Sequence, residues 1–123
     1  MPLRSLALIR LIPVLALAGL TLQASGPGFR TRHLLEEAFA KYGHDFGNIS
    51  QEQYLKMAQQ LRDARSGRNI LEMPRREGGG MRFDRRSGAF VAWNADRTIR
   101  LFFMPKDGER YFHRQRDAEQ PEK

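Results

Sequence analysis

Short apolar segments with a period of two fill the second half of the chain, and turn residues separate them. Such alternation is typical of β-strands that bury one face. The expected strands are 69–73, 81–84, 89–93, 98–104 and 110–113. Because a parallel crossover needs about a dozen residues or more, connections this short require antiparallel hairpins. The pattern therefore predicts an antiparallel sheet, with four or five strands depending on whether the last segment joins it.

Two amphipathic helices are expected ahead of the sheet. Apolar residues of the first recur every four positions, at Leu34, Ala38 and Tyr42. Gly43 is expected to end this helix. Ser50 is the expected N-cap of the second, with Gln53 three residues later as in a capping box, and Gly67 is its expected end. Helices followed by an antiparallel sheet define an α+β domain, in which the two N-terminal helices pack on the sheet.

The expected strand 98–104 shows how the sheet would divide its two faces. Ile99, Leu101 and Phe103 share one face, which is expected to pack on the helices. The other face carries Arg100 and Phe102, a cation beside an aromatic ring. The pattern thus predicts one covered face and one open face.

A hydrophobic signal segment precedes the domain. Residues 1–10 carry two arginines and no acidic residue, and residues 11–22 form a nearly unbroken apolar run. This layout is typical of a secretory signal, and the run is shorter than the roughly 20 residues of a spanning helix. Cleavage after Ala24 is expected, although Leu22 two positions earlier leaves open an uncleaved membrane anchor with a tether through residues 6–22. The protein is therefore expected to be exported, to the periplasm or beyond.

The remaining chain divides into a Gly/Pro linker at 25–30, one α+β domain at 31–116 and a disordered tail at 117–123. Because it contains no cysteine, the domain can form neither disulfides nor a thiolate metal site. The histidines share no spacing typical of a metal site, so neither metal nor cofactor is expected; they are His33, His44 and His113.

The net charge of +7 favours an acidic partner such as nucleic acid, anionic lipid headgroups or an acidic protein. Arginines interleave with aromatic residues in the sheet half, at positions 82, 85, 86, 97, 100, 110, 114 and 116. Guanidinium groups bind phosphates and aromatic rings stack on unpaired bases, so a strand face with both predicts RNA binding. The expected binding residues are Arg82, Trp93, Phe102, Arg110 and His113. The alternative is a solvated basic face over an aromatic core.

Three stretches of the chain resemble a known family. They are AFAKYGHDFGNISQEQYLKMAQQL, MRFDRRSGAF and DRTIRLFFMPKDGERYF, and together they cover most of the chain after the signal. They are similar to the C-terminal toxin domains of bacterial polymorphic and contact-dependent systems, in the barnase/EndoU/colicin/RelE-like ribonuclease group. They resemble more closely small exported proteins with the same domain.

The resemblance implies metal-independent RNA cleavage, in which side chains move protons and cations stabilise the transition state. By the same resemblance, Lys41 contacts phosphate, Arg100 is the transition-state cation, and Tyr111 is an acid or a stacking group. Two positions where the family has histidine carry Ala38 and Tyr42, and the family's threonine is replaced by Leu101. His44 is a substitute only if the chain turns at Gly43 to redirect it.

These observations predict an exported basic domain that binds RNA or another polyanion, with weak or lost catalysis. One alternative is a periplasmic protein-interaction module without nucleic-acid activity. Another is an active secreted nuclease that uses His44 or His113. The expected catalytic set is Lys41, His44, Arg100 and Tyr111, and its convergence in one cleft would favour a site.

Overall fold

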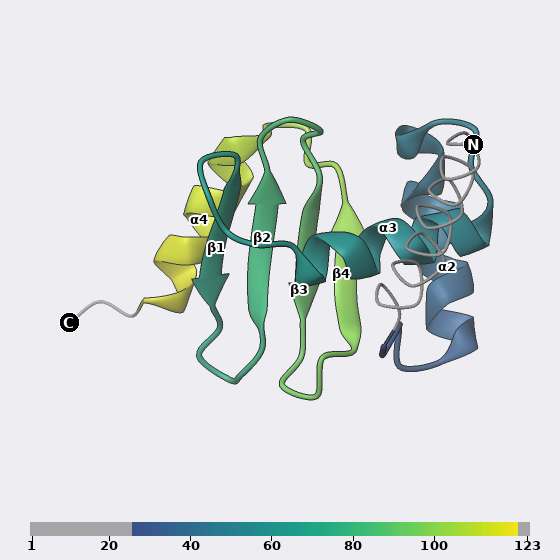
Figure 1. The fold of residues 1–123 in the computed structure, drawn as a ribbon, viewed down its shortest axis with the longest axis horizontal. Coiled ribbons are helices and arrows are strands. Elements are labelled where there is room, and N and C mark those ends of the chain that lie inside the picture. The colour runs from purple at the N-terminus through teal and green to yellow at the C-terminus, as the bar shows by residue number, and fades with distance from the viewer. Residues whose placement is uncertain (1–25, 121–123) are drawn as a thin grey trace, which may run out of the picture.

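The α+β class is confirmed by a computed structural model, which describes residues 26–120. The elements follow one another as α2 (Arg32–Tyr42), the 3₁₀ helix η1 (Gly43–Phe46), α3 (Gln51–Asp63), β1 (Ile70–Pro74), β2 (Gly80–Asp84), β3 (Phe90–Trp93), β4 (Ile99–Phe103) and α4 (Glu109–Glu119). Figure 1 shows the sheet between α4 and the pair α2 and α3. The expected signal segment at 1–24 lies outside the described residues, as do residues 121–123 of the expected tail. No helix within residues 26–120 is long and apolar enough to cross a membrane.

The two expected N-terminal helices are present. Thr31 caps α2 by accepting a hydrogen bond from the Leu34 N–H. Ser50 and Gln53 form the expected capping box at the start of α3. The predicted end of this helix is wrong, because α3 ends at Asp63 rather than near Gly67. Its C-cap, Ala64, has extended backbone angles, so the chain leaves the helix before the glycine.

The sheet is antiparallel with the order β1-β2-β3-β4. Its four strands match the first four predicted segments to within one residue at each end. Gly79, between β1 and β2, has a φ of +80°, and a Cβ there would lie 2.0 Å from the Trp93 carbonyl oxygen. Only glycine fits at this approach of two neighbouring hairpins.

The fifth predicted strand, 110–113, is wrong. These residues lie in α4, which also extends past the predicted domain end at Arg116 to Glu119. The segment is rich in Glu, Arg and Gln, which favour helix, and α4 has Glu109 in its first turn and Arg116 in its last. Phe112 is its buried anchor, at 3% exposure.

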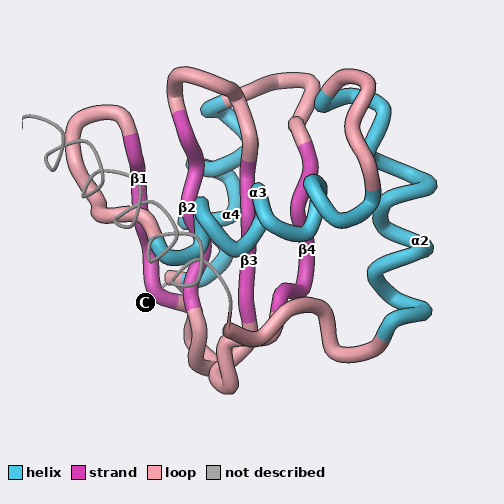
Figure 2. Tube along the Cα trace, turned by 45° about the vertical axis from the view of Figure 1, so that its right-hand side comes forward, coloured by secondary structure: helices cyan, strands magenta, loops and turns pink. Residues whose placement is uncertain are grey.

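Both faces of the sheet are covered, one by α2 and α3 and the other by α4. On one face, Val91, Trp93 and Phe102 form a core with α2 and α3. On the other face, residues of β2 and β3 form a second core with Phe112 of α4. Figure 2 shows α3 in front of the sheet, α4 behind it and α2 beside β4. The predicted open, basic sheet face is therefore wrong.

The folded unit also begins earlier than the predicted start at Thr31. The Ile99 N–H donates to the Gly28 carbonyl at 2.8 Å, and Phe29 forms a parallel bridge with Ile99. Phe29 also stacks on Tyr54, with ring centroids 6.2 Å apart. Part of the expected linker is thus an additional strip beside the outer edge of β4.

Candidate functional site

A cleft of about 320 Å³ lies between α2 and the outer edge of β4. We call it the edge cleft. Leu34, Ala38 and Tyr42, on successive turns of α2, line one wall, and residues 99–101 of β4 line the other. The four-residue spacing that makes α2 amphipathic thus places these three side chains in one row along the strand. Such a cleft is large enough for one unit of a polymer.

The cations of the edge cleft are Lys41 from α2 and Arg100 from β4. Both are exposed, and neither forms an ion pair with any of the described residues. By contrast Arg30, on the same cleft, is bound to Asp96 at 3.1 Å. Two unneutralised cations from different elements therefore face one cavity, which favours an anionic ligand.

The expected catalytic set converges only in part. Lys41 and Arg100 share the edge cleft, but His44 lines a separate pocket and lies 3.5 Å from the Asp45 carboxylate. Gly43 continues from α2 into η1, so no turn there redirects the histidine into the cleft. Tyr111 lies on α4, and its ring contacts that of Phe103 with centroids 5.2 Å apart.

The edge cleft contains the two positions at which the resembled family has histidine, but Ala38 and Tyr42 occupy them. The carboxylate at the rim is Glu37, which binds His33 at 3.0 Å in an i,i+4 pair. Both side chains are mostly exposed, at 62% and 74%. Sequence reasoning missed Glu37, although its place four residues before Lys41 puts both on one side of α2.

Two expected binding residues are buried and cannot stack on a base. Trp93 is 8% exposed and Phe102 is 1% exposed. The Phe102 ring stacks on Phe46 with centroids 4.6 Å apart, inside the core. Arg82 lies over the Trp93 ring and donates to Glu72 at 3.0 Å. The binding role predicted for Trp93 and Phe102 is therefore wrong.

The expected arginine cluster does not form one surface. Arg82 lies on β2, Arg100 on the β4 edge, and Arg110 on the exposed side of α4. Several members of the cluster are in ion pairs with carboxylates, namely Arg82, Arg85, Arg97, Arg114 and Arg116. Pairing leaves fewer charges for a ligand. The edge cleft is lined by two cations that have no ion pair with a described residue.

His113 lies on α4 and contacts Glu109, one turn earlier on the same helix. Its Nε2 lies 2.9 Å from Glu109, which also accepts two hydrogen bonds from Arg85 at 2.8 and 3.0 Å. These contacts tie the first turns of α4 to the β2–β3 turn. The Arg85 hydrogen bonds and, after them, the one from His113 lower the pKa of Glu109 to about 2.

This depressed pKa predicts an acid-dependent loss of stability. The folded-state pKa of Glu109 lies below the ordinary value of 4.5. The contribution of its carboxylate contacts to the free energy of unfolding is therefore complete above pH 4.5 and is lost as the pH falls toward about 2. Urea unfolding at about pH 6 and about pH 3 should show a smaller loss on acidification in Glu109→Gln than in the wild type. Glu77→Gln, at an 84% exposed side chain, is the control and should keep the wild-type profile. Coinciding profiles of Glu109→Gln and the wild type would contradict this role.

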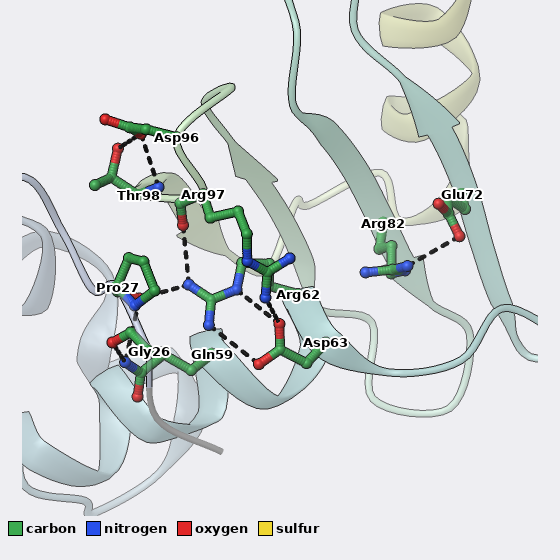
Figure 3. A network of polar contacts seen from close by, with 10 residues as sticks. All are labelled: Gly26, Pro27, Gln59, Arg62, Asp63, Glu72, Arg82, Asp96, Arg97 and Thr98. Atoms are coloured by element: carbon green, nitrogen blue, oxygen red, sulfur yellow. Dashed lines mark hydrogen bonds and ion pairs between the residues drawn. The ribbon is translucent and has the colours of Figure 1, made fainter. Parts of the chain in front are cut away.

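Arg62 is the most buried charged group among the described residues, with a side chain that is 0% exposed. Figure 3 shows it between the start of the domain, the end of α3 and the β3–β4 turn. It donates to the carbonyl oxygens of Pro27 and Arg97, the latter at 2.9 Å, and binds Asp63 through two nitrogens. Burial raises the pKa of Asp63, but the hydrogen bonds and charges of Arg62 and Arg97 outweigh it and hold that pKa below its usual value.

Comparisons with known proteins assign neither a family nor a function to the chain. No protein-family model matches the chain, and the search of curated proteins finds no match. The ribonuclease-toxin resemblance therefore stays a prediction.

Proposed function

We propose that the domain binds the phosphate backbone of RNA in the edge cleft and does not cleave it. The observation that carries this proposal is that Lys41 of α2 and Arg100 of β4 line the same cavity. Neither forms an ion pair with a described carboxylate. A guanidinium binds phosphate through two donors, and an ammonium adds a mobile point charge. Leu34, Ala38 and Leu101 add apolar surface to the cleft, which suits the flat faces of bases and sugars.

The absence of cleavage in this proposal rests on which groups line the cleft. Proton transfer in RNA cleavage needs a positioned acid and base within hydrogen-bond reach of the reacting oxygens. No histidine lines the edge cleft among the described residues. Glu37 is there, but it is held in a solvent-exposed pair with His33. In this proposal the cations supply binding, and the histidines that would move protons in the resembled family are replaced by Ala38 and Tyr42.

An exported location is part of the same proposal. Its support is the arginine-containing start and the apolar run at 11–22. Cleavage after Ala24 would leave residues 26–120 intact, because the described residues begin at Gly26. N-terminal sequencing of the protein from a fractionated cell tests this: a periplasmic chain that begins at Ser25 is expected, and a cytoplasmic full-length chain would contradict export.

Removing either cleft cation should weaken RNA binding. Fluorescence anisotropy with a short single-stranded RNA should show roughly fivefold to tenfold weaker binding for Arg100→Ala and for Lys41→Ala, since each loses one charge-assisted contact of about 1–1.5 kcal/mol. Arg76→Ala is the matched control. Arg76 is an exposed arginine beside β1, at the opposite edge of the sheet, so its loss should change affinity less than about twofold.

The same proteins should leave RNA intact during incubation in EDTA. Cleavage that Glu37→Gln abolishes would contradict the binding-only proposal and make the domain a nuclease. Equal affinities of Arg100→Ala, Arg76→Ala and the wild type would contradict the edge cleft as the binding site. Absence of any RNA binding would favour the protein-interaction module instead.

A further inference from the structure

We propose that the phenol hydroxyls of Tyr42 and Tyr111 bind the 2′-hydroxyl of ribose, so that the site selects single-stranded RNA over single-stranded DNA. This inference rests on the proposed function. It adds a second part to the site, next to the edge cleft, and a chemical reason for the choice of nucleic acid.

A row of aromatic rings crosses the outer edge of the sheet beside the cleft. The Tyr42 ring of α2 lies 5.2 Å from that of Phe103 on β4, and Phe103 lies 5.2 Å from Tyr111 on α4. All three rings are partly exposed. Tyr42 also lines the edge cleft, so the row begins where the cleft ends.

A cation lies over the ring at each end of the row. The Lys41 ammonium is 5.3 Å from the centre of the Tyr42 ring, and the Arg114 guanidinium is 5.7 Å from that of Tyr111. Arg114 is further fixed by an ion pair with Asp107. The order along the surface is therefore cation, phenol, phenyl, phenol, cation. Because Arg114 is paired with Asp107, Lys41 is the phosphate-binding group of the row.

The two hydroxyls are free to bind a ligand. Tyr54 uses its hydroxyl in the core, where it donates to the Phe102 carbonyl at 2.5 Å. The hydroxyls of Tyr42 and Tyr111 make no hydrogen bond to any described residue. Burial raises the pKa of Tyr111, and the Tyr42 phenol raises it further, which reflects the closeness of the two groups. A phenol hydroxyl can both donate and accept a hydrogen bond.

These features fit ribose better than deoxyribose. A 2′-hydroxyl both donates and accepts a hydrogen bond, as a phenol does, and it is the group by which a protein distinguishes RNA from DNA. A backbone whose phosphate lies at Lys41 would place its sugars along the row. The aromatic edges of Phe103 and its neighbours offer apolar surface for the flat side of the sugar.

The test compares single-stranded RNA and DNA of one sequence by anisotropy, with the wild type, Tyr42→Phe, Tyr111→Phe and the double variant. Each Phe variant keeps the ring and removes only the hydroxyl. One lost hydrogen bond corresponds to about a fivefold change. The wild type should therefore prefer RNA by about tenfold or more, each single variant should lose much of that preference, and the double variant should bind RNA and DNA within about twofold.

Tyr54→Phe is the matched control, because it removes a hydroxyl from the core instead. It should lower stability and keep the RNA preference. Equal binding of RNA and DNA by the wild type would overturn this inference, as would a preference that survives in the double variant. If Arg100→Ala still weakens binding in that case, the edge-cleft proposal stands and only the ribose contact fails. If Arg100→Ala has no effect, the proposed function itself fails.

Discussion

Replacement of Arg62 by alanine is expected to destabilise the domain by about 3–5 kcal/mol, the usual range for breaking a buried ion pair from one side. The guanidinium is 0% exposed and joins Pro27, Asp63 and Arg97, which belong to three separate segments. Without it, the carbonyl groups of Pro27 and Arg97 and the partly exposed Asp63 carboxylate lose a buried donor. The whole stability of a domain this size is about 5–15 kcal/mol, so the effect should be easy to measure.

Urea unfolding followed by circular dichroism measures this effect. Arg97→Ala is the control, because Arg97 binds the same Asp63 carboxylate but has a side chain that is 51% exposed. Screening by solvent limits such a contact to about 1 kcal/mol or less. A loss in Arg62→Ala no larger than that in Arg97→Ala would contradict the role of Arg62 in holding the first described residues against α3.

Truncation of Phe102 to alanine should destabilise the domain by about 3–5 kcal/mol, as is typical for a large aromatic residue in a core. Its ring is 1% exposed and packs against Phe46 and Tyr54, with centroids 4.6 and 5.3 Å away. The cavity left behind cannot close, because the rings on either side are held by η1 and α3.

RNA affinity separates this core role from the binding role that the sequence predicts for Phe102. Phe102→Leu keeps an apolar side chain and should lose less than about 1.5 kcal/mol, so the variant stays folded. Its affinity for RNA, measured under conditions where it is folded, should match that of the wild type. Weaker RNA binding by a fully folded Phe102→Leu would show that the ring meets the ligand after all.

The sequence pattern predicts four strands and two helices well because each has a local signal. The capping box at Ser50 and the turn residues between strands act over a few residues, and they are visible without the fold. The fifth strand fails for the opposite reason. In 110–113 two adjacent aromatic residues carry no clear period, and helix propensity over the longer stretch 109–119 decides the structure.

One signal for the second core was present in the sequence. The segment AFVAW at 89–93 is apolar without interruption, and all four residues of β3 are buried. A strand with both faces covered has such a run, whereas a half-exposed strand alternates. The register of β3 and β4 also shifts between Ala92 and Trp93. Ile99 and Phe102, which strict alternation would place on opposite faces, therefore lie in the same core.

The candidate site could be predicted only in part. Lys41 and Arg100 were expected from the resemblance, and they do share a cavity. Tyr42 joins the aromatic row only because α2 packs beside β4. No local sequence pattern predicts that packing. Arg62 gave no sequence signal, since a buried arginine and an exposed one look alike until the chain folds.

Nuclear magnetic resonance of the labelled domain, titrated with a short single-stranded RNA, tests the central claim most directly. The backbone amide signals of residues 37–42 and 99–103 should shift in a saturable way, because these segments carry side chains that line both walls of the edge cleft. Shifts that are confined to the exposed side of α4 or to the β1 edge would contradict the claim that RNA binds between α2 and β4.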